Sequence, residues 1–204
     1  MTNFVSATSK NALRRHYLSL RKEMEESEWV KRNQGILDQI MHLDIPALQN
    51  PQPYVHIYLA ITKNREPDTH HIAAALNEKN PTIQWVISKT DMVNARLYHF
   101  LWDAENLVEE NAWGIPEPVG GIRVDEKQLD VIFVPLIVAD HKGHRVGYGK
   151  GFYDRFLSQC RPDALKIGIS LFELVDEIAD PLPTDIPLDA CITPKGTYWF
   201  NKSS

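Results

Sequence analysis

The chain has 204 residues, of which 43% are hydrophobic and 24% are charged, and this composition is typical of one soluble globular domain. Its formal net charge of −5 argues against the basic face of a nucleic-acid-binding protein. The longest apolar run, 131–139, is about half the length of a membrane-spanning helix, and the first residues lack a secretory signal's apolar segment. We expect a cytoplasmic monomer that acts on small molecules, with neither nucleic acid nor membrane as partner.

Two helices are predicted in the first quarter of the chain. Ser9 is a suitable N-cap, and Leu13, Tyr17, Leu20 and Met24 follow in one helical stripe. The opposite face carries the basic side chains Lys10, Arg14, Arg15, Arg21 and Lys22. A second helix is expected over 27–43, before a segment with three prolines.

Beyond residue 53 strands alternate with helices. The strands are expected at 54–60, 83–88, 96–102, 130–139 and 165–172, and the helices at 68–79 and 151–160. Apolar runs such as 131–134 do not alternate with polar residues, which indicates strands covered on both faces. The sequence predicts one α/β domain over residues 1–204, a three-layer αβα arrangement of the Rossmann-like kind with a mainly parallel sheet.

A glycine-rich stretch, GHRVGYGKGFYDRF (143–156), follows the expected strand 130–139. In such folds ligands bind beyond the carboxyl ends of the strands. Glycines leave backbone N–H groups uncovered, and bare amides beside Arg145 and Lys150 would suit phosphate. The stretch matches neither a Walker A loop nor a dinucleotide fingerprint. The alternative is a flexible turn with solvated basic side chains.

Carboxylates near this stretch suggest magnesium. Asp154 would lie in the first turn of the following helix, where an acidic residue most often serves the helix dipole, but close to phosphates it could hold Mg²⁺. Asp185 and Asp189 lie in a proline-rich loop and either could be the second carboxylate. Spacing does not choose between them.

Several blocks resemble one family, the 5-formyltetrahydrofolate cyclo-ligases, also called methenyltetrahydrofolate synthetases. The most specific is VPLIVADHKGHRVGYGKGFYD, and the others, in the expected order, are SKNALRRHYLSLR, REPDT, GIPEP and PLDACITP. The resemblance implies an ATP- and Mg²⁺-dependent conversion of 5-formyltetrahydrofolate into 5,10-methenyltetrahydrofolate, ADP and phosphate, in which the formyl oxygen is phosphorylated. It also implies a fold like that of sugar-phosphate isomerases and CoA-transferases.

The resemblance further implies a role for individual residues. Those expected to bind ATP are Lys10, Arg14, Arg145, Val146, Gly147, Tyr148, Gly149, Lys150, Gly151, Phe152 and Tyr153. Those expected to bind the folate are Leu59, Ile61, Glu66, Tyr148, Gly149, Lys150, Gly151 and Phe152. Arg145, Lys150 and Tyr153 would be catalytic, and the match to PLDACITP selects Asp189 to bind Mg²⁺ together with Asp154.

Several of these residues could instead have a structural role that involves no ligand. Lys10 and Arg14 could form a solvated basic face, and Glu66 could be an exposed loop residue before a proline. Phe152 replaces the family's first tyrosine, Tyr148 occupies a position that is often arginine, and either Leu59 or Ile61 could line the pocket. His70, His71, His141 and His144 form no zinc-like pattern with the two distant cysteines and are expected to be surface or loop residues. Cys160 and Cys191 are expected to be free thiols, buried or partly buried.

Two other functions are compatible with the predicted fold and with a folate-binding pocket. A sugar-phosphate isomerase or acyl-transferase relative would need a carboxylate base and no nucleotide, and only fold analogy supports it. An idle folate-binding protein would have no need for two magnesium carboxylates.

Overall fold

The computed structural model describes residues 7–103 and 107–200. Helix α1 (Lys10–Glu23) begins at Ser9, whose side chain accepts a hydrogen bond from the backbone N–H of Ala12 at 3.4 Å, so the predicted N-cap is confirmed. Helix α2 (Glu26–His42) follows and ends before the short 3₁₀ turn η1 (Pro46–Gln49). Among the described residues no helix combines the length and apolarity needed to cross a membrane.

An eight-stranded sheet forms the centre of the molecule. In spatial order its strands are β12 (Gly196–Trp199), β11 (Ala190–Thr193), β10 (Leu165–Ile169), β7 (Val131–Pro135), β1 (Tyr54–His56), β2 (Gln84–Asp91), β3 (Arg96–Leu101) and β6 (Arg123–Val124). The five strands from β11 to β2 are parallel, and β12, β3 and β6 pair antiparallel to their neighbours. The predicted α/β class with a mainly parallel sheet is confirmed.

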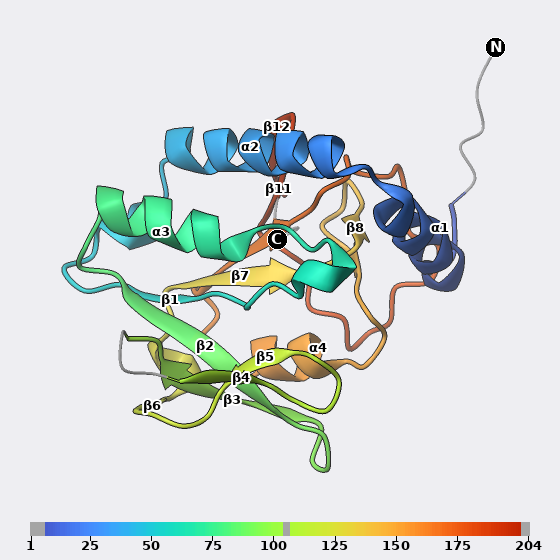
Figure 1. Cartoon of the computed structure of the whole chain (residues 1–204). Coiled ribbons are helices and arrows are strands. Elements are labelled where there is room, and N and C mark those ends of the chain that lie inside the picture. The colour runs from blue at the N-terminus through green and yellow to red at the C-terminus, as the bar shows by residue number, and fades with distance from the viewer. Residues whose placement is uncertain (1–6, 104–106, 201–204) are drawn as a thin grey trace.

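Helices lie on both faces of this sheet (Figure 1). Helices α2 and α3 (Thr69–Lys79) lie along one face, and Asp68 caps α3 by accepting a hydrogen bond from the N–H of His71 at 3.1 Å. The other face carries the six-residue helix α4 (Phe152–Leu157) and the hairpin of β4 (Val108–Glu110) and β5 (Pro116–Pro118). The second layer is therefore thinner than the first.

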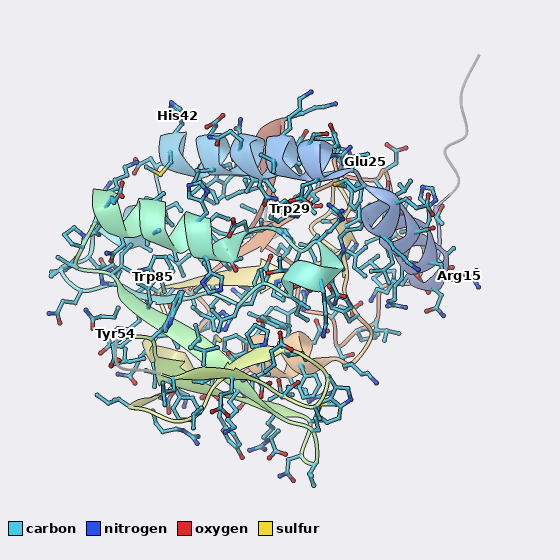
Figure 2. All side chains as sticks on the ribbon, in the orientation of Figure 1. Arg15, Glu25, Trp29, His42, Tyr54 and Trp85 are labelled. Atoms are coloured by element: carbon cyan, nitrogen blue, oxygen red, sulfur yellow. The ribbon has the colours of Figure 1, made fainter. Side chains whose placement is uncertain are left out.

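Each face has its own apolar core because successive side chains of the buried strands point to opposite sides. Phe133 packs toward α2 and α3, whereas its neighbours Ile132 and Val134 pack toward α4. Trp29 lies between α2 and the segment that precedes α3 (Figure 2) and donates a hydrogen bond from Nε1 to the carbonyl of Glu66 at 3.0 Å. This contact anchors the loop that carries Glu66.

Some sequence-based expectations about these elements were wrong. Leu20, placed in the core stripe of α1, is 40% exposed, whereas Arg21, placed on the polar face, is 4% exposed. The expected strand 130–139 divides into β7 and the two-residue strand β8 (Val138–Ala139), because the chain turns at Leu136 to pair with β9 (Arg145–Val146). The expected strand 54–60 pairs regularly only as far as His56.

Candidate active site at the glycine turn

The residues from Arg145 to Gly151, called the glycine turn below, connect β9 to α4 beyond the carboxyl end of β7. Figure 1 shows the arrow of β7 pointing toward β8 and α1, which places the turn at the ligand-binding edge expected for such sheets. Gly149 and Gly151 have φ angles of +85° and +67°, which other residues rarely adopt. Since α4 has only six residues, its dipole adds little, and nearby side chains must supply most of the positive charge.

Basic side chains from α1 reach this turn. Arg14 donates a hydrogen bond from Nε to the carbonyl of Gly147 at 2.7 Å, and its guanidinium lies beside Gly149. Lys10 forms an ion pair with Asp185. Arg14 therefore contacts the turn itself, Lys10 contacts the neighbouring Asp185 segment, and neither is simply a solvated residue.

Arg145 and Lys150 differ in their surroundings. Arg145 is buried, binds Asp154 through Nη2 at 2.5 Å and donates to the carbonyl of Ile186. Lys150 is exposed and makes no ion pair within the described residues. Arg145 thus holds α4 and the loop around Ile186 together, whereas Lys150 is available for a ligand.

Asp154 and Asp185 both adjoin Arg145. Oδ1 of Asp154 also accepts a hydrogen bond from the N–H of Ile186 at 3.1 Å, so Asp154 is joined to the residue that follows Asp185. Burial opposes ionisation of Asp185, but the hydrogen bond from Lys10 and the charges of Lys10 and Arg145 outweigh it and lower the pKa of Asp185. Both carboxylates therefore lie beside the cations of the turn.

Asp189 lies elsewhere. It immediately precedes β11, and its Oδ2 accepts hydrogen bonds from the backbone N–H of Lys166 at 2.8 Å and from Lys166 Nζ at 3.3 Å. Lys166 belongs to the first residues of β10, so this buried pair closes the amino end of the sheet. The structure joins Asp154 to the Asp185 segment, while the sequence had favoured Asp189.

Glu66 is 4% exposed, so the reading of it as an exposed loop residue was wrong. It follows the 3₁₀ turn η2 (Thr62–Asn64), and its Oε2 accepts a hydrogen bond from the N–H of Ile61 at 2.8 Å. Its Oε1 accepts from the hydroxyl of Tyr148, which belongs to the glycine turn. Burial raises the pKa of Glu66, although these two hydrogen bonds and the charge of Arg21 oppose the shift.

Aromatic side chains complete the surroundings of Glu66. Burial and the charge of Glu66 raise the pKa of Tyr153, which keeps its hydroxyl protonated at neutral pH. The ring of Tyr153 lies 5.9 Å from that of His56, and Phe152 packs partly buried against the second core. Leu59 is buried and Ile61 is half-buried, and Ile61 borders a pocket of about 210 Å³ that Lys63 and His70 also line.

A larger pocket of about 480 Å³ lies between α1 and residues 174–177 and contains none of the predicted site residues. The larger of these two pockets therefore does not coincide with the predicted active site. Within residues 7–103 and 107–200, no group of three or more His, Cys, Asp or Glu side chains could hold a metal ion by itself. A metal at the glycine turn would need oxygens from a ligand as well.

Two side chains of this site were missed from the sequence. Arg21 donates a hydrogen bond from Nη2 to the hydroxyl of Tyr148 at 2.5 Å. Tyr58 lies buried near Glu66, and burial, followed by the charge of Glu66, raises the pKa of Tyr58. Arg21 follows Arg14 by two helical turns, and this spacing could have grouped it with Lys10 and Arg14. No spacing or motif in the sequence pointed to Tyr58.

Comparisons with known proteins agree with the resemblance seen in the motifs. A "Probable 5-formyltetrahydrofolate cyclo-ligase" of Schizosaccharomyces pombe is 37% identical over 99 residues, which span 42% of this chain and about half (48%) of that protein. A Mycoplasma pneumoniae 5-formyltetrahydrofolate cyclo-ligase is 29% identical over 189 residues, 90% of this chain and 97% of that protein.

The fold has a solved counterpart as well. The NMR structure of Aquifex aeolicus 5,10-methenyltetrahydrofolate synthetase matches with a TM-score of 0.74 at 24% identity, over 96% of this chain and 94% of that one. The sequence profile of the 5-formyltetrahydrofolate cyclo-ligase family matches residues 6–194. The chain therefore belongs to the 5-formyltetrahydrofolate cyclo-ligase family.

Proposed function

We propose that this protein converts 5-formyltetrahydrofolate into 5,10-methenyltetrahydrofolate while ATP becomes ADP and phosphate. The observation that carries the proposal is the convergence on one glycine turn of cations from α1 with two acidic side chains and the buried Glu66. A nucleotide's phosphates need the cations, and a folate's N–H groups need the carboxylate. Both requirements meet at one edge of the sheet.

The phosphates of ATP would lie on the glycine turn. Arg14 contacts the backbone of the turn, and Lys10 forms an ion pair with the neighbouring Asp185. Lys150 is exposed and makes no ion pair within the described residues. Val146 to Tyr153 supply the surrounding backbone. Because Arg145 is already engaged by Asp154 and Ile186, Lys150 is the better candidate to follow the phosphoryl group as it is transferred.

Asp154 and Asp185 would hold Mg²⁺. The donor set suits this hard cation, which commonly binds one or two carboxylates together with phosphate oxygens, and Asp154 Oδ2 accepts no hydrogen bond from the described residues. Bound Mg²⁺ would neutralise charge on the phosphate oxygens. Asp189, which the family resemblance had selected, is buried with Lys166 where β10 and β11 begin, whereas Asp185 lies beside Lys10 and Arg145, so we assign Asp189 a structural role.

The folate would bind between Glu66 and the aromatic residues of the turn. A carboxylate is the usual partner for the adjacent N–H donors of a pterin's amino-pyrimidine edge. Leu59 and Ile61 would form apolar walls, and Ile61 is the better placed of the two because it borders the 210 Å³ pocket while Leu59 is buried. Phe152 and the backbone of residues 148–151 would contact the ring.

The reaction begins from a poor electrophile, because a formyl group on nitrogen is amide-like. Transfer of the γ-phosphoryl group to the formyl oxygen gives an iminium-like phosphate, which N10 of the same molecule attacks. The C–O bond then breaks, and phosphate leaves with the proton that N10 gives up. Such a transfer depends mainly on positioning and charge neutralisation. Tyr153 stays protonated, so its hydroxyl can donate a hydrogen bond to the formyl oxygen but is unsuited to act as a base.

A spectroscopic assay tests this proposal. Protein mixed with 5-formyltetrahydrofolate, Mg²⁺ and ATP should produce the conjugated methenyl chromophore, and omission of ATP should abolish it. A chromophore that forms equally fast without nucleotide would contradict the proposal and indicate acid chemistry. A cytoplasmic location and a monomeric state stay predictions that a cell fractionation and a sedimentation experiment can check.

The choice between Asp185 and Asp189 has its own test. Asp185→Asn should raise the Mg²⁺ concentration needed for tight binding of a non-hydrolysable ATP analogue, whereas Asp189→Asn should leave that requirement unchanged. The opposite pattern would return the metal role to Asp189.

A further inference from the structure

Tyr148 links the two halves of the site through its hydroxyl. It belongs to the glycine turn, yet its hydroxyl donates a hydrogen bond to Oε1 of Glu66, on a loop 82 residues away in the sequence. The other carboxylate oxygen accepts from the N–H of Ile61 at 2.8 Å. Both oxygens of the carboxylate that a folate would need are therefore occupied by the protein itself.

Tyr148 has the form of a cap over this carboxylate. Its side chain is 40% exposed while Glu66 beneath it is 4% exposed. Gly147 and Gly149 flank it, and a Cβ built on Gly147 would meet no atom within 4 Å. Glycines on both sides give this backbone access to conformations that other residues rarely adopt, while the hydrogen bond from Arg14 holds the carbonyl of Gly147.

Polar groups under the cap are incompletely satisfied. Arg21 is 4% exposed, and within the described residues its guanidinium makes a single hydrogen bond, the one to Tyr148 Oη at 2.5 Å, and no ion pair. The hydroxyl of Tyr58 is buried without a hydrogen-bond partner. A buried hydroxyl is normally paired, so that of Tyr58, together with the spare donors of Arg21, indicates a place where a polar ligand binds.

We propose that Tyr148 is a positioning residue that caps Glu66 in the free protein and releases it when substrates bind. The inference rests on the proposed function, in which Glu66 binds the folate and the glycine turn binds the nucleotide. The folate must take Oε1 of Glu66 from Tyr148, and a nucleotide that draws the turn toward its phosphates must break the same hydrogen bond. Arg21 can keep its bond to the tyrosine hydroxyl after the release.

Because both substrates must break the hydrogen bond between Tyr148 and Glu66, the binding of one affects the affinity of the other. Whichever ligand binds first breaks the cap, and the second then binds without that penalty, which is positive coupling by thermodynamic linkage. A hydrogen bond to a charged group is worth a coupling of roughly tenfold. Tyr148 thus favours occupation of the site by both substrates over occupation by one.

Calorimetric titrations of the full chain test this inference. The ligands are 5-formyltetrahydrofolate and a non-hydrolysable ATP analogue with Mg²⁺, each alone and each in the presence of the other. In the wild type each ligand should tighten the other about tenfold. In Tyr148→Phe, which keeps the ring, each ligand alone should bind about tenfold more tightly and the coupling should fall to about one.

Tyr198→Phe is the matched control, because the hydroxyl of Tyr198 also donates to a glutamate, Oε2 of Glu173 at 3.0 Å, away from the turn. It should leave both affinities and the coupling unchanged, and melting curves should show that each variant is folded. The inference is overturned if Tyr148→Phe weakens or does not alter folate binding, or if Tyr198→Phe reproduces its gain. A wild type that binds neither ligand would instead refute the proposed function.

Discussion

Charged side chains gather at both ends of the central sheet, but their partners differ. At the amino end, Asp130 accepts hydrogen bonds from Arg161 at 2.5 Å, from Asn50 at 3.0 Å and from the N–H of Tyr54 at 2.8 Å. Lys166 and Asp189 form a buried pair at the same end. Each of these charges has its partners within the protein.

At the carboxyl end the cations Lys10, Arg14, Arg21, Arg145 and Lys150 surround the glycine turn. Lys150 makes no ion pair and Arg21 makes one hydrogen bond within the described residues. Fully paired charges hold strands together, whereas charges with spare bonding capacity are suited to ligands. The contrast predicts stability effects at one end and binding effects at the other.

The largest effect is expected from Asp189→Ala, at the amino end. Removing one partner of a buried ion pair leaves Lys166 without its counter-charge, which should cost about 3–5 kcal/mol in the free energy of unfolding. Denaturant unfolding measures this loss. Below the melting transition, Mg²⁺-nucleotide affinity should stay within about twofold of the wild type, since Asp189 lies away from the turn.

Asp163→Ala serves as the control for that change. Asp163 is exposed and lies 3.6 Å from Arg161, so its loss should change stability little. If Asp189→Ala were as stable as this control but no longer bound Mg²⁺-nucleotide, the distinction between the two ends of the sheet would be wrong.

Asp154→Asn should show the reverse pattern at the carboxyl end. Turnover in the chromophore assay should fall by about a hundredfold, because in the proposed mechanism this carboxylate holds the Mg²⁺ that neutralises charge at the transferred phosphate. The free energy of unfolding should change much less than for Asp189→Ala, since Asp154 is only partly buried. Wild-type turnover in this variant would remove Asp154 from the metal site.

The free energy of unfolding should depend on pH through two buried histidines, His56 and His99, the first of which lies beside Tyr153. Ser88 joins His56 and His99 there through hydrogen bonds of 2.8 and 2.9 Å. Burial and the charge of Arg123 lower the pKa of His99 to about 4 against an ordinary 6.5, so the unfolded chain binds a proton that the folded chain refuses. Stability should therefore fall as the pH drops from 6.5 toward 4, by roughly 1–2 kcal/mol at pH 5.

His99→Gln should reduce this pH dependence in unfolding experiments between pH 7 and 5, and the part that remains would belong to His56, whose pKa burial also lowers. His42→Gln, at an exposed position on α2, should leave it unchanged. Equal slopes in all three proteins would exclude His99 as the source.

The smallest effect is expected from Glu66→Gln. The amide keeps the shape but loses the charge that N–H donors favour, so folate affinity should weaken about tenfold. Nucleotide affinity should not fall and should rise somewhat, because Tyr148 then makes a weaker hydrogen bond to residue 66. Titration with each ligand separately measures both quantities. Equal loss of both affinities would indicate misfolding rather than lost recognition.

Much of this molecule could be predicted from local pattern. The N-cap at Ser9, the three long helices and the buried parallel strands follow from capping and periodicity, and the glycine turn follows from its composition. The strands β4 to β6, β9, the parallel strand β11 and the edge strand β12 were not among those expected, because two to four residues carry too little pattern to be recognised.

The site was harder to predict because it depends on contacts between distant segments. Arg21 has the sequence signature of a solvated arginine, yet it is buried and contacts Tyr148, which is 127 residues away in the sequence. Asp185 and Asp189 are four residues apart, and only the path of the loop sends one toward Lys10 and the other toward Lys166. No local spacing contains that information.

The central claim is that the glycine turn holds the phosphates of ATP beside Asp154 and Asp185. A crystal structure with a non-hydrolysable ATP analogue and Mn²⁺ in place of Mg²⁺ tests it most directly, because anomalous scattering locates the metal. We predict phosphate density against residues 145–151 and a metal between Asp154 and Asp185. Phosphates bound elsewhere with the glycine turn empty, or a metal bound to Asp189, would contradict the account.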